Sequence, residues 1–242
     1  MRTRQEIKAI GKSRFKANYW TCVLAVLLIG LALAALSALS AGQTYTQEIQ
    51  SAIDGSEPET VNATFSLRTG IGALASLLLA GPLTVGLNYF HVMNILGRDE
   101  EVLVTTPFRA AFTNYPRKLG GALWMELFVF LWSLLLIIPG IIKTFSYAMT
   151  PYILADCPNV KAKDALKLSM RIMKGHKWEL FVFDLSFIGW YLLSILTVGI
   201  LNIFFTDPYR YNSLATYYLE VREEALRTGA ITMGQLEGTE AV

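Results

Sequence analysis

Runs of about 20 mostly apolar residues alternate with short charged segments along this sequence. A helix needs ~20 such residues to cross the ~30 Å hydrocarbon core of a bilayer. Because 53% of the residues are apolar and only 17% are charged, the composition differs from that of an ordinary soluble domain. The sequence therefore predicts an all-α fold, a polytopic bundle of membrane-spanning helices.

About six spans are expected, paired as three hairpins in one membrane domain that covers residues 1–221. The expected spans are residues 20–41, 67–96, 119–138, 141–155, 178–203 and 208–221. The fourth is short, with ~22 Å of helical rise, and the sixth is the most polar. In the second span, Gly81-Pro82 predicts either a kink or a re-entrant break. Residues 222–242 mix charges with Gly and Thr, so a flexible tail is expected there.

Two stripes of basic residues, spaced to share one helical face, precede the first and fifth expected spans. The first consists of Arg4, Lys8, Lys12 and Lys16, and the second of Lys163, Lys167, Arg171 and Lys174. Each stripe predicts a basic amphipathic interfacial helix in contact with the anionic headgroups of the lipid bilayer. Residues 42–66 are acidic and hold no Lys or Arg, which predicts an external loop. Both termini are therefore expected in the cytoplasm.

An internal repeat is also expected. Residues 126–130 and 179–183 are both ELFVF, and each copy follows a Trp and a basic segment. We interpret the chain as three units in the same orientation, each a basic interfacial helix followed by a helical hairpin, as in parallel membrane repeats. The alternative is that cytoplasmic basic segments and interfacial Trp residues produce this pattern without common ancestry.

Three acidic residues inside the expected spans are candidates for a functional site, because ionisable groups are expensive in a membrane. Asp184, expected near the inner interface, is either a proton or cation site or a hydrogen-bonded contact between helices. Glu126 and Glu179 lie closer to the basic segments, where they are expected to reach the headgroups or to pair with Lys118 and Lys177.

Polar residues also recur every three positions in the second span, at Asn88, His91 and Asn94. This stripe could line a water-filled path or supply interhelical hydrogen bonds worth ~0.6 kcal/mol each. No metal site is expected, because His91 and His176, the two histidines, lie at different depths without nearby ligands. The sequence has no phosphate-binding glycine loop and no nucleophile elbow, so we expect no cofactor and no nucleic-acid partner.

Several motifs resemble a known family. They are IPGIIK at 138–143, YAMTPYILAD at 147–156, MKGHKW at 173–178, DLSFIGW at 184–190 and DPY at 207–209. In order and spacing they resemble the bacterial integral-membrane family catalogued as domain-of-unknown-function family 975, from the second span onward. The resemblance implies a multi-pass protein of the bacterial cytoplasmic membrane. It implies no activity.

The sequence thus favours a non-enzymatic multi-pass membrane protein that binds or transports a small molecule or lipid, or acts as the partner of another membrane protein. A transporter should bring its polar stripes to a common cavity, whereas a partner protein should have a dry bundle. The alternative is an intramembrane or lipid-modifying enzyme that uses Asp184, His91 or Glu179. It would need two of these groups within ~3.2 Å of each other or of one water.

Overall fold

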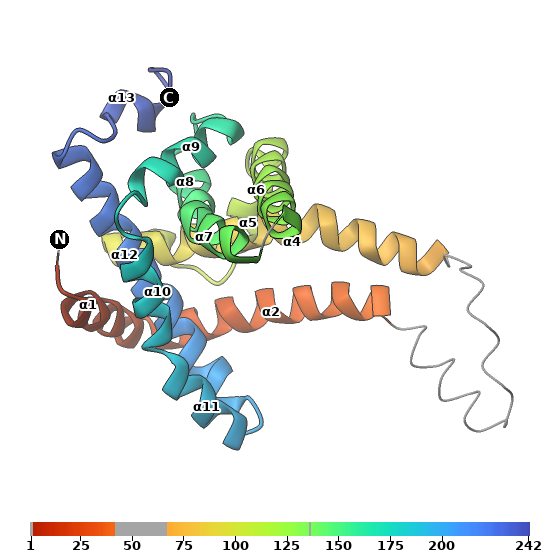
Figure 1. Ribbon diagram of the computed structural model, residues 1–242. Helices are drawn as coiled ribbons and strands as arrows, with labels where there is room; N and C mark the ends of the chain where they lie inside the picture. Colours follow the sequence, from red (N-terminus) through yellow and green to blue (C-terminus); the bar gives the residue numbers. More distant parts are fainter. Residues whose placement is uncertain (1, 42–66, 136) are drawn as a thin grey trace, which may run out of the picture.

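A computed structural model describes residues 2–41, 67–135 and 137–242 (Figure 1). The regular elements of these residues are all helical, as predicted. In chain order they are α1 (Arg4–Ala17), α2 (Tyr19–Ala41), α4 (Leu67–Leu96), the 3₁₀ turn η1 (Asp99–Glu101), α5 (Thr106–Phe112), α6 (Tyr115–Leu135), α7 (Ile137–Tyr147), α8 (Thr150–Asp156), α9 (Ala162–Ile172), α10 (Lys177–Leu185), α11 (Ile188–Leu196), the π-helical η2 (Asn202–Thr206), α12 (Asp207–Arg227) and α13 (Met233–Glu237). The expected external loop at 42–66 lies outside the described residues.

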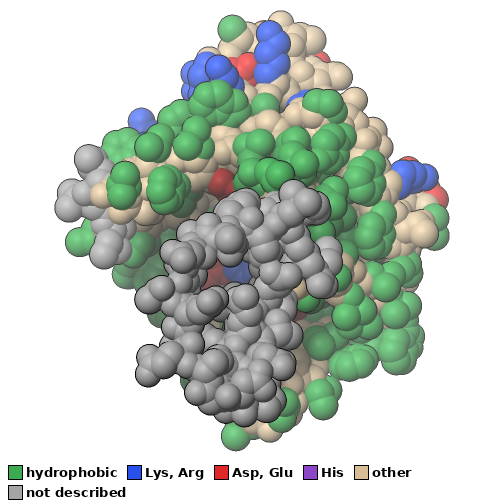
Figure 2. Space-filling view, turned by 90° about the vertical axis from the view of Figure 1, so that its right-hand side faces the viewer, with side chains coloured by type: hydrophobic (Ala, Val, Ile, Leu, Met, Phe, Trp, Pro, Cys, Tyr) green, Lys and Arg blue, Asp and Glu red, His purple; other side chains and the backbone are tan. Residues whose placement is uncertain are grey.

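Three stretches of the described chain are long and apolar enough to cross a membrane: Tyr19–Ala38, Gly72–Leu96 and Lys177–Leu196. Only 28%, 39% and 22% of their residues are buried, so most of their apolar surface has no protein cover. Figure 2 shows many hydrophobic side chains on the visible face, with most of the visible Lys and Arg side chains near its upper and right-hand edges. A multi-pass membrane protein is the class that leaves such surface exposed, because lipid covers it.

The second span is one continuous helix. Pro82 lies inside α4, so Gly81-Pro82 does not interrupt the chain with a re-entrant break. A Cβ atom on Gly81 would lie 2.3 Å from the Cβ atom of Ala122 in α6. The small residue at this position therefore permits close packing of α4 against α6.

The connections after α6 and α11 differ from the expected span limits. The helix that returns after α6 begins at Ile137 and resumes in α8, so it is longer than the expected 141–155. The break between α7 and α8 is stabilised by Ser169 of α9, whose hydroxyl accepts from Met149 N (3.2 Å) and donates to Ser146 O (2.9 Å). The fifth span ends at Leu196 and not at 203, because the chain turns at Val198 (φ 52°) and Gly199 (φ 82°).

The segment 222–242, expected to be a flexible tail, contains helical structure. Helix α12 continues to Arg227, and a further helix, α13, starts with a capping box between Thr232 and Gln235. Ile231 and Leu236 are buried, with 2% and 6% of their surface exposed. Buried apolar side chains and a satisfied helix start stabilise a defined structure in this segment.

Three helices pack on helices that lie far from them or just before them in the chain: α5 packs on α4, α9 on α8 and α6, and α1 on α12. Two of these contacts depend on glycine. A Cβ atom on Gly86 of α4 would lie 2.0 Å from Pro107 O, and one on Gly11 of α1 would lie 2.7 Å from Ser213 Cα of α12. Helices α4, α8 and α12 meet in the interior, where Tyr152 stacks on Tyr218.

Seven of the eight residues in the two basic stripes are exposed; Lys8 is half-buried. Its ammonium lies 4.1 Å from the centre of the Phe187 ring and donates to Ser186 Oγ at 2.9 Å. Burial, and secondarily the charge of Arg4, lowers the pKa of Lys8. Lys8 therefore binds the bend between α10 and α11. The contact of the two stripes with lipid headgroups stays a prediction.

Candidate functional site

A cluster of polar side chains lies in the core where α2, α4 and α12 meet. The Asn94 amide donates to Asn212 Oδ1 at 2.6 Å and contacts Cys22 Sγ at 3.4 Å. Asn18, at the end of α1, donates to Asn94 Oδ1 at 2.9 Å. Asn94, Asn212 and Cys22 are completely buried. We call these four residues the polar core cluster.

Helical spacing explains the geometry of the polar core cluster. Asn18 and Cys22 are four residues apart across the α1–α2 junction, so their side chains lie on one face. Asn212 lies in the second turn of α12, with its amide also bonded to Pro208 O at 2.8 Å. Buried polar groups need hydrogen-bond partners, and these side chains supply them to one another directly.

His91, one turn before Asn94, is buried beside this cluster. Its ring stacks on Tyr211 of α12, with 5.3 Å between ring centres and 7° between planes. The Asn212 amide lies near the ring, but neither ring nitrogen has a hydrogen-bond partner of normal geometry in the described chain. Asn88, the third member of the predicted stripe, is also buried, at 3% exposure, outside the bonded cluster.

Asp184 forms an ion pair that the sequence did not indicate. Its Oδ1 atom accepts from Arg210 Nη2 at 2.7 Å and from Arg210 Nε at 3.1 Å. About 30% of each side chain is exposed. The pair thus joins α10 to α12.

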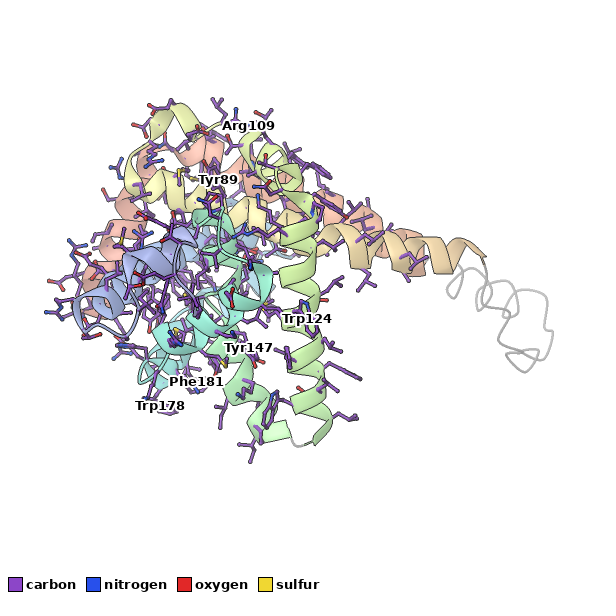
Figure 3. The ribbon with its side chains drawn as sticks, turned by 90° about the horizontal axis from the view of Figure 1, so that it is seen from above. Tyr89, Arg109, Trp124, Tyr147, Trp178 and Phe181 are labelled. Carbon is purple, nitrogen blue, oxygen red and sulfur yellow. The ribbon has the colours of Figure 1, made fainter. Side chains whose placement is uncertain are left out.

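The two glutamates lie elsewhere. Glu179 is 3.2 Å from His176 Nδ1, not paired with Lys177. Glu126 is exposed on α6 and has no ion pair within the described chain; Lys118, its expected partner, donates instead to Ala110 O. Trp124 and Trp178, the residues that precede the two ELFVF copies, lie on separate elements, α6 and α10 (Figure 3).

The structure therefore brings together only part of the predicted set. His91 and Asn94 join Tyr211 and Asn212, whereas Asp184, Glu179 and Glu126 remain apart. Within the described residues no hydrogen bond joins any two of Asp184, His91 and Glu179, which the enzyme alternative requires. The part of the chain that the structure describes contains no group of three or more His, Cys, Asp and Glu residues that could hold a metal ion.

Sequence reasoning missed Asn18 and Cys22. The signal available was their spacing of four residues at the start of the first span, together with an amide at the end of the preceding basic helix. Their partners, however, are 72 to 190 residues away in the chain, and no local pattern indicates which helix they meet.

Residues 134–225 match the family model described as Protein of unknown function (DUF975). The predicted resemblance is confirmed for this region. The DUF975 region starts near the end of α6 and ends in α12, so it includes all the quoted motifs but not α4, to which we expected the resemblance to extend. It contains Asp184, Arg210 and Asn212, and excludes Asn18, Cys22 and Asn94. No curated protein and no solved structure matches the chain.

Proposed function

We propose that this protein crosses the bacterial cytoplasmic membrane six times as three hairpins, with both termini in the cytoplasm. Three candidate spans support the proposal directly. Helices α6 and α7 also pack against each other and project from the body as a pair (Figure 3). Large apolar side chains are exposed on α6, which suits lipid contact; they include Leu127, Phe130, Leu131 and Leu134.

The order in which the basic helices pack supports three like units. The three units comprise α1 to α4, α5 to α8, and α9 to α12. The first helix of the second and of the third unit contacts the returning helix of the unit before it, α5 with α4 and α9 with α8. The N-terminal helix α1 contacts α12, the returning helix of the last unit, which closes the series into a ring. Such closure is the arrangement expected of parallel repeats around an axis along the membrane normal.

We further propose that the protein is non-enzymatic and acts by binding a lipid or another membrane protein at its surface, not by carrying a solute across the membrane. The observation that carries this proposal is the 2.6 Å hydrogen bond between Asn94 and Asn212. At that distance no water fits between the two amides. The polar residues of the first, second and last spans thus bond one another across the position where a transport path would pass.

The reactivity of Cys22 tests this proposal. With Cys157→Ala, Cys22 is the one thiol left in the chain, which has two cysteines. In membrane vesicles a charged, water-soluble thiol reagent should leave Cys22 unmodified until the protein is denatured. A variant with Cys22→Ala, Cys157→Ala and a cysteine at exposed Lys167 controls for reagent delivery. Reaction of Cys22 in the folded protein would show a water-filled path and would favour transport.

A further inference from the structure

A pocket of about 390 Å³ lies between α4, α5, α6 and α8, and none of the four residues of the polar core cluster lines it. Tyr89 and Arg109, both of which line it, come from the adjoining helices α4 and α5 and lie near each other in Figure 3. The charged lining residues are Arg98, Glu101, Arg109, Arg117, Lys118 and Asp156. The protein itself neutralises some of these charges.

Both carboxylates have basic partners. Glu101 Oε2 accepts from Arg109 Nη2 at 2.6 Å. Asp156 pairs with Arg222, which is not among the lining residues, and also accepts from the Tyr218 hydroxyl at 3.0 Å. Three cations remain, namely Arg98, Arg117 and Lys118, and none of them forms an ion pair within the described chain. The six charged lining residues therefore carry a net charge of +2, and the three cations without an ion pair are the ones available to an anion.

Two of the three cations are held in place by backbone carbonyl groups. Arg117 donates to Leu154 O at 3.0 Å and also to Cys157 O and Val160 O, so its guanidinium closes the end of α8. A guanidinium has five N–H groups, so two remain for another acceptor. Lys118, with 5% of its surface exposed, donates to Ala110 O. These groups are fixed before any ligand arrives.

Of the three cations, Lys118 is the one whose burial costs free energy. A buried ammonium group without a counter-charge is destabilising unless an anion is supplied. Burial, and secondarily the adjacent Arg117, lowers the pKa of Lys118 to about 8. The third cation, Arg98, is exposed and lies against the pocket wall, with Nη1 4.0 Å from Met93 Sδ.

The rest of the lining fits an anion with an apolar attachment. Thr113 and Asn114 precede the first turn of α6, where the positive end of the helix dipole favours negative charge. Tyr89, Met93 and Leu154 form an apolar wall beside the charges. We propose that this pocket binds a phosphate group through Arg98, Arg117 and Lys118. The phosphate belongs to an anionic lipid headgroup or to a small soluble phosphate compound.

Binding measurements on the purified full chain test the proposal, with one arm for each source of phosphate. In the lipid arm, retention of phosphatidylglycerol over phosphatidylcholine is measured by native mass spectrometry after release from mixed nanodiscs. In the soluble arm, pyrophosphate binding to detergent-purified protein is measured by calorimetry. Arg98→Gln and Lys118→Met remove a pocket charge, and Arg227→Gln removes an exposed charge at the end of α12, outside the pocket and outside both basic stripes, as the matched control.

We expect wild-type protein to bind in at least one arm, and Arg98→Gln to weaken that binding at least ten-fold while Arg227→Gln leaves it unchanged. Selective retention of phosphatidylglycerol alone identifies a lipid headgroup, and pyrophosphate binding alone identifies a soluble compound. If Lys118→Met does not fold, Arg98→Gln tests the proposal by itself, because its exposed side chain contributes little to packing. Equal weakening by Arg98→Gln and Arg227→Gln, or no binding in either arm, overturns the proposal. No residue of the polar core cluster lines the pocket, so that failure would leave the proposed function standing.

Discussion

Substitution of Gly86 by Ala tests whether the packing of α5 on α4 is as close as the structure shows. A Cβ atom there would lie 2.0 Å from Pro107 O and 2.9 Å from Ala111 N, both of them backbone atoms. Backbone cannot rotate away as a flexible side chain does, so α5 has to move by an ångström or more. Overpacking of this kind costs about 1–3 kcal/mol, although Ala returns up to about 1 kcal/mol of helix propensity.

Gly30→Ala is the matched control, because a Cβ atom on Gly30 of α2 would meet no other atom within 4 Å. Unfolding in mixed micelles, followed by circular dichroism against denaturing detergent, compares the two variants with wild type. Gly86→Ala should lower the free energy of unfolding by about 1–2 kcal/mol relative to Gly30→Ala. If the two variants are equally stable, the close contact between α4 and α5 is wrong, and with it this part of the ring of basic helices.

Three further predictions concern polar groups. Asn94→Leu should cost about 1–2 kcal/mol of unfolding free energy in the same assay, since it leaves buried Asn212 and Asn18 without their partner, and Asn88→Leu should cost less; equal costs would refute the importance of the cluster. Asp184→Asn should lower the free energy of unfolding by about 1 kcal/mol or less, because its pair with Arg210 is partly exposed. The double variant with Arg210→Gln should cost less than the sum of the two single changes, whereas strictly additive costs would show that the pair contributes nothing. Since the pKa of Lys118 is lowered to about 8, its protonated fraction falls about ten-fold between pH 7 and pH 9. Binding of a phosphodiester headgroup should weaken over that range in wild type but not in Lys118→Met, whereas a pH-independent affinity would remove Lys118 from the site; the other charged groups lining the pocket are Arg98, Arg109, Arg117, Glu101 and Asp156.

The local features of the fold could be predicted from the sequence. The apolar runs predict α2 and α4 with the observed limits, because a span is encoded in consecutive residues. The limit of the fifth span was wrong because apolar residues continue through the turn at Val198 and Gly199, and hydropathy does not detect a turn made of such residues. The folded tail was missed although its signal, the capping box of Thr232 and Gln235, is present in the sequence.

Pairings between distant helices could not be predicted. Asp184 and Arg210 are 26 residues apart and Asn94 and Asn212 are 118 apart, so their meeting depends on how hairpins pack. Lys8 has the spacing of a lipid-facing stripe, yet it binds Ser186 because α1 packs where α10 bends. Sequence patterns indicate which face of a helix a residue occupies, whereas the fold determines what lies opposite that face.

Labelling at the tip of the α6–α7 hairpin tests the six-span topology most directly. Ile138 is exposed at this tip, and the three candidate spans taken alone would leave it in the cytoplasm. Single cysteines at Ile138, Val198 and Lys167, in a chain with Cys22→Ala and Cys157→Ala, are exposed to a membrane-impermeant thiol reagent on intact cells. Six spans predict that Ile138 and Val198 are labelled from outside and Lys167 only after permeabilisation. Labelling of Val198 with protection of Ile138 until permeabilisation would contradict the three-hairpin arrangement.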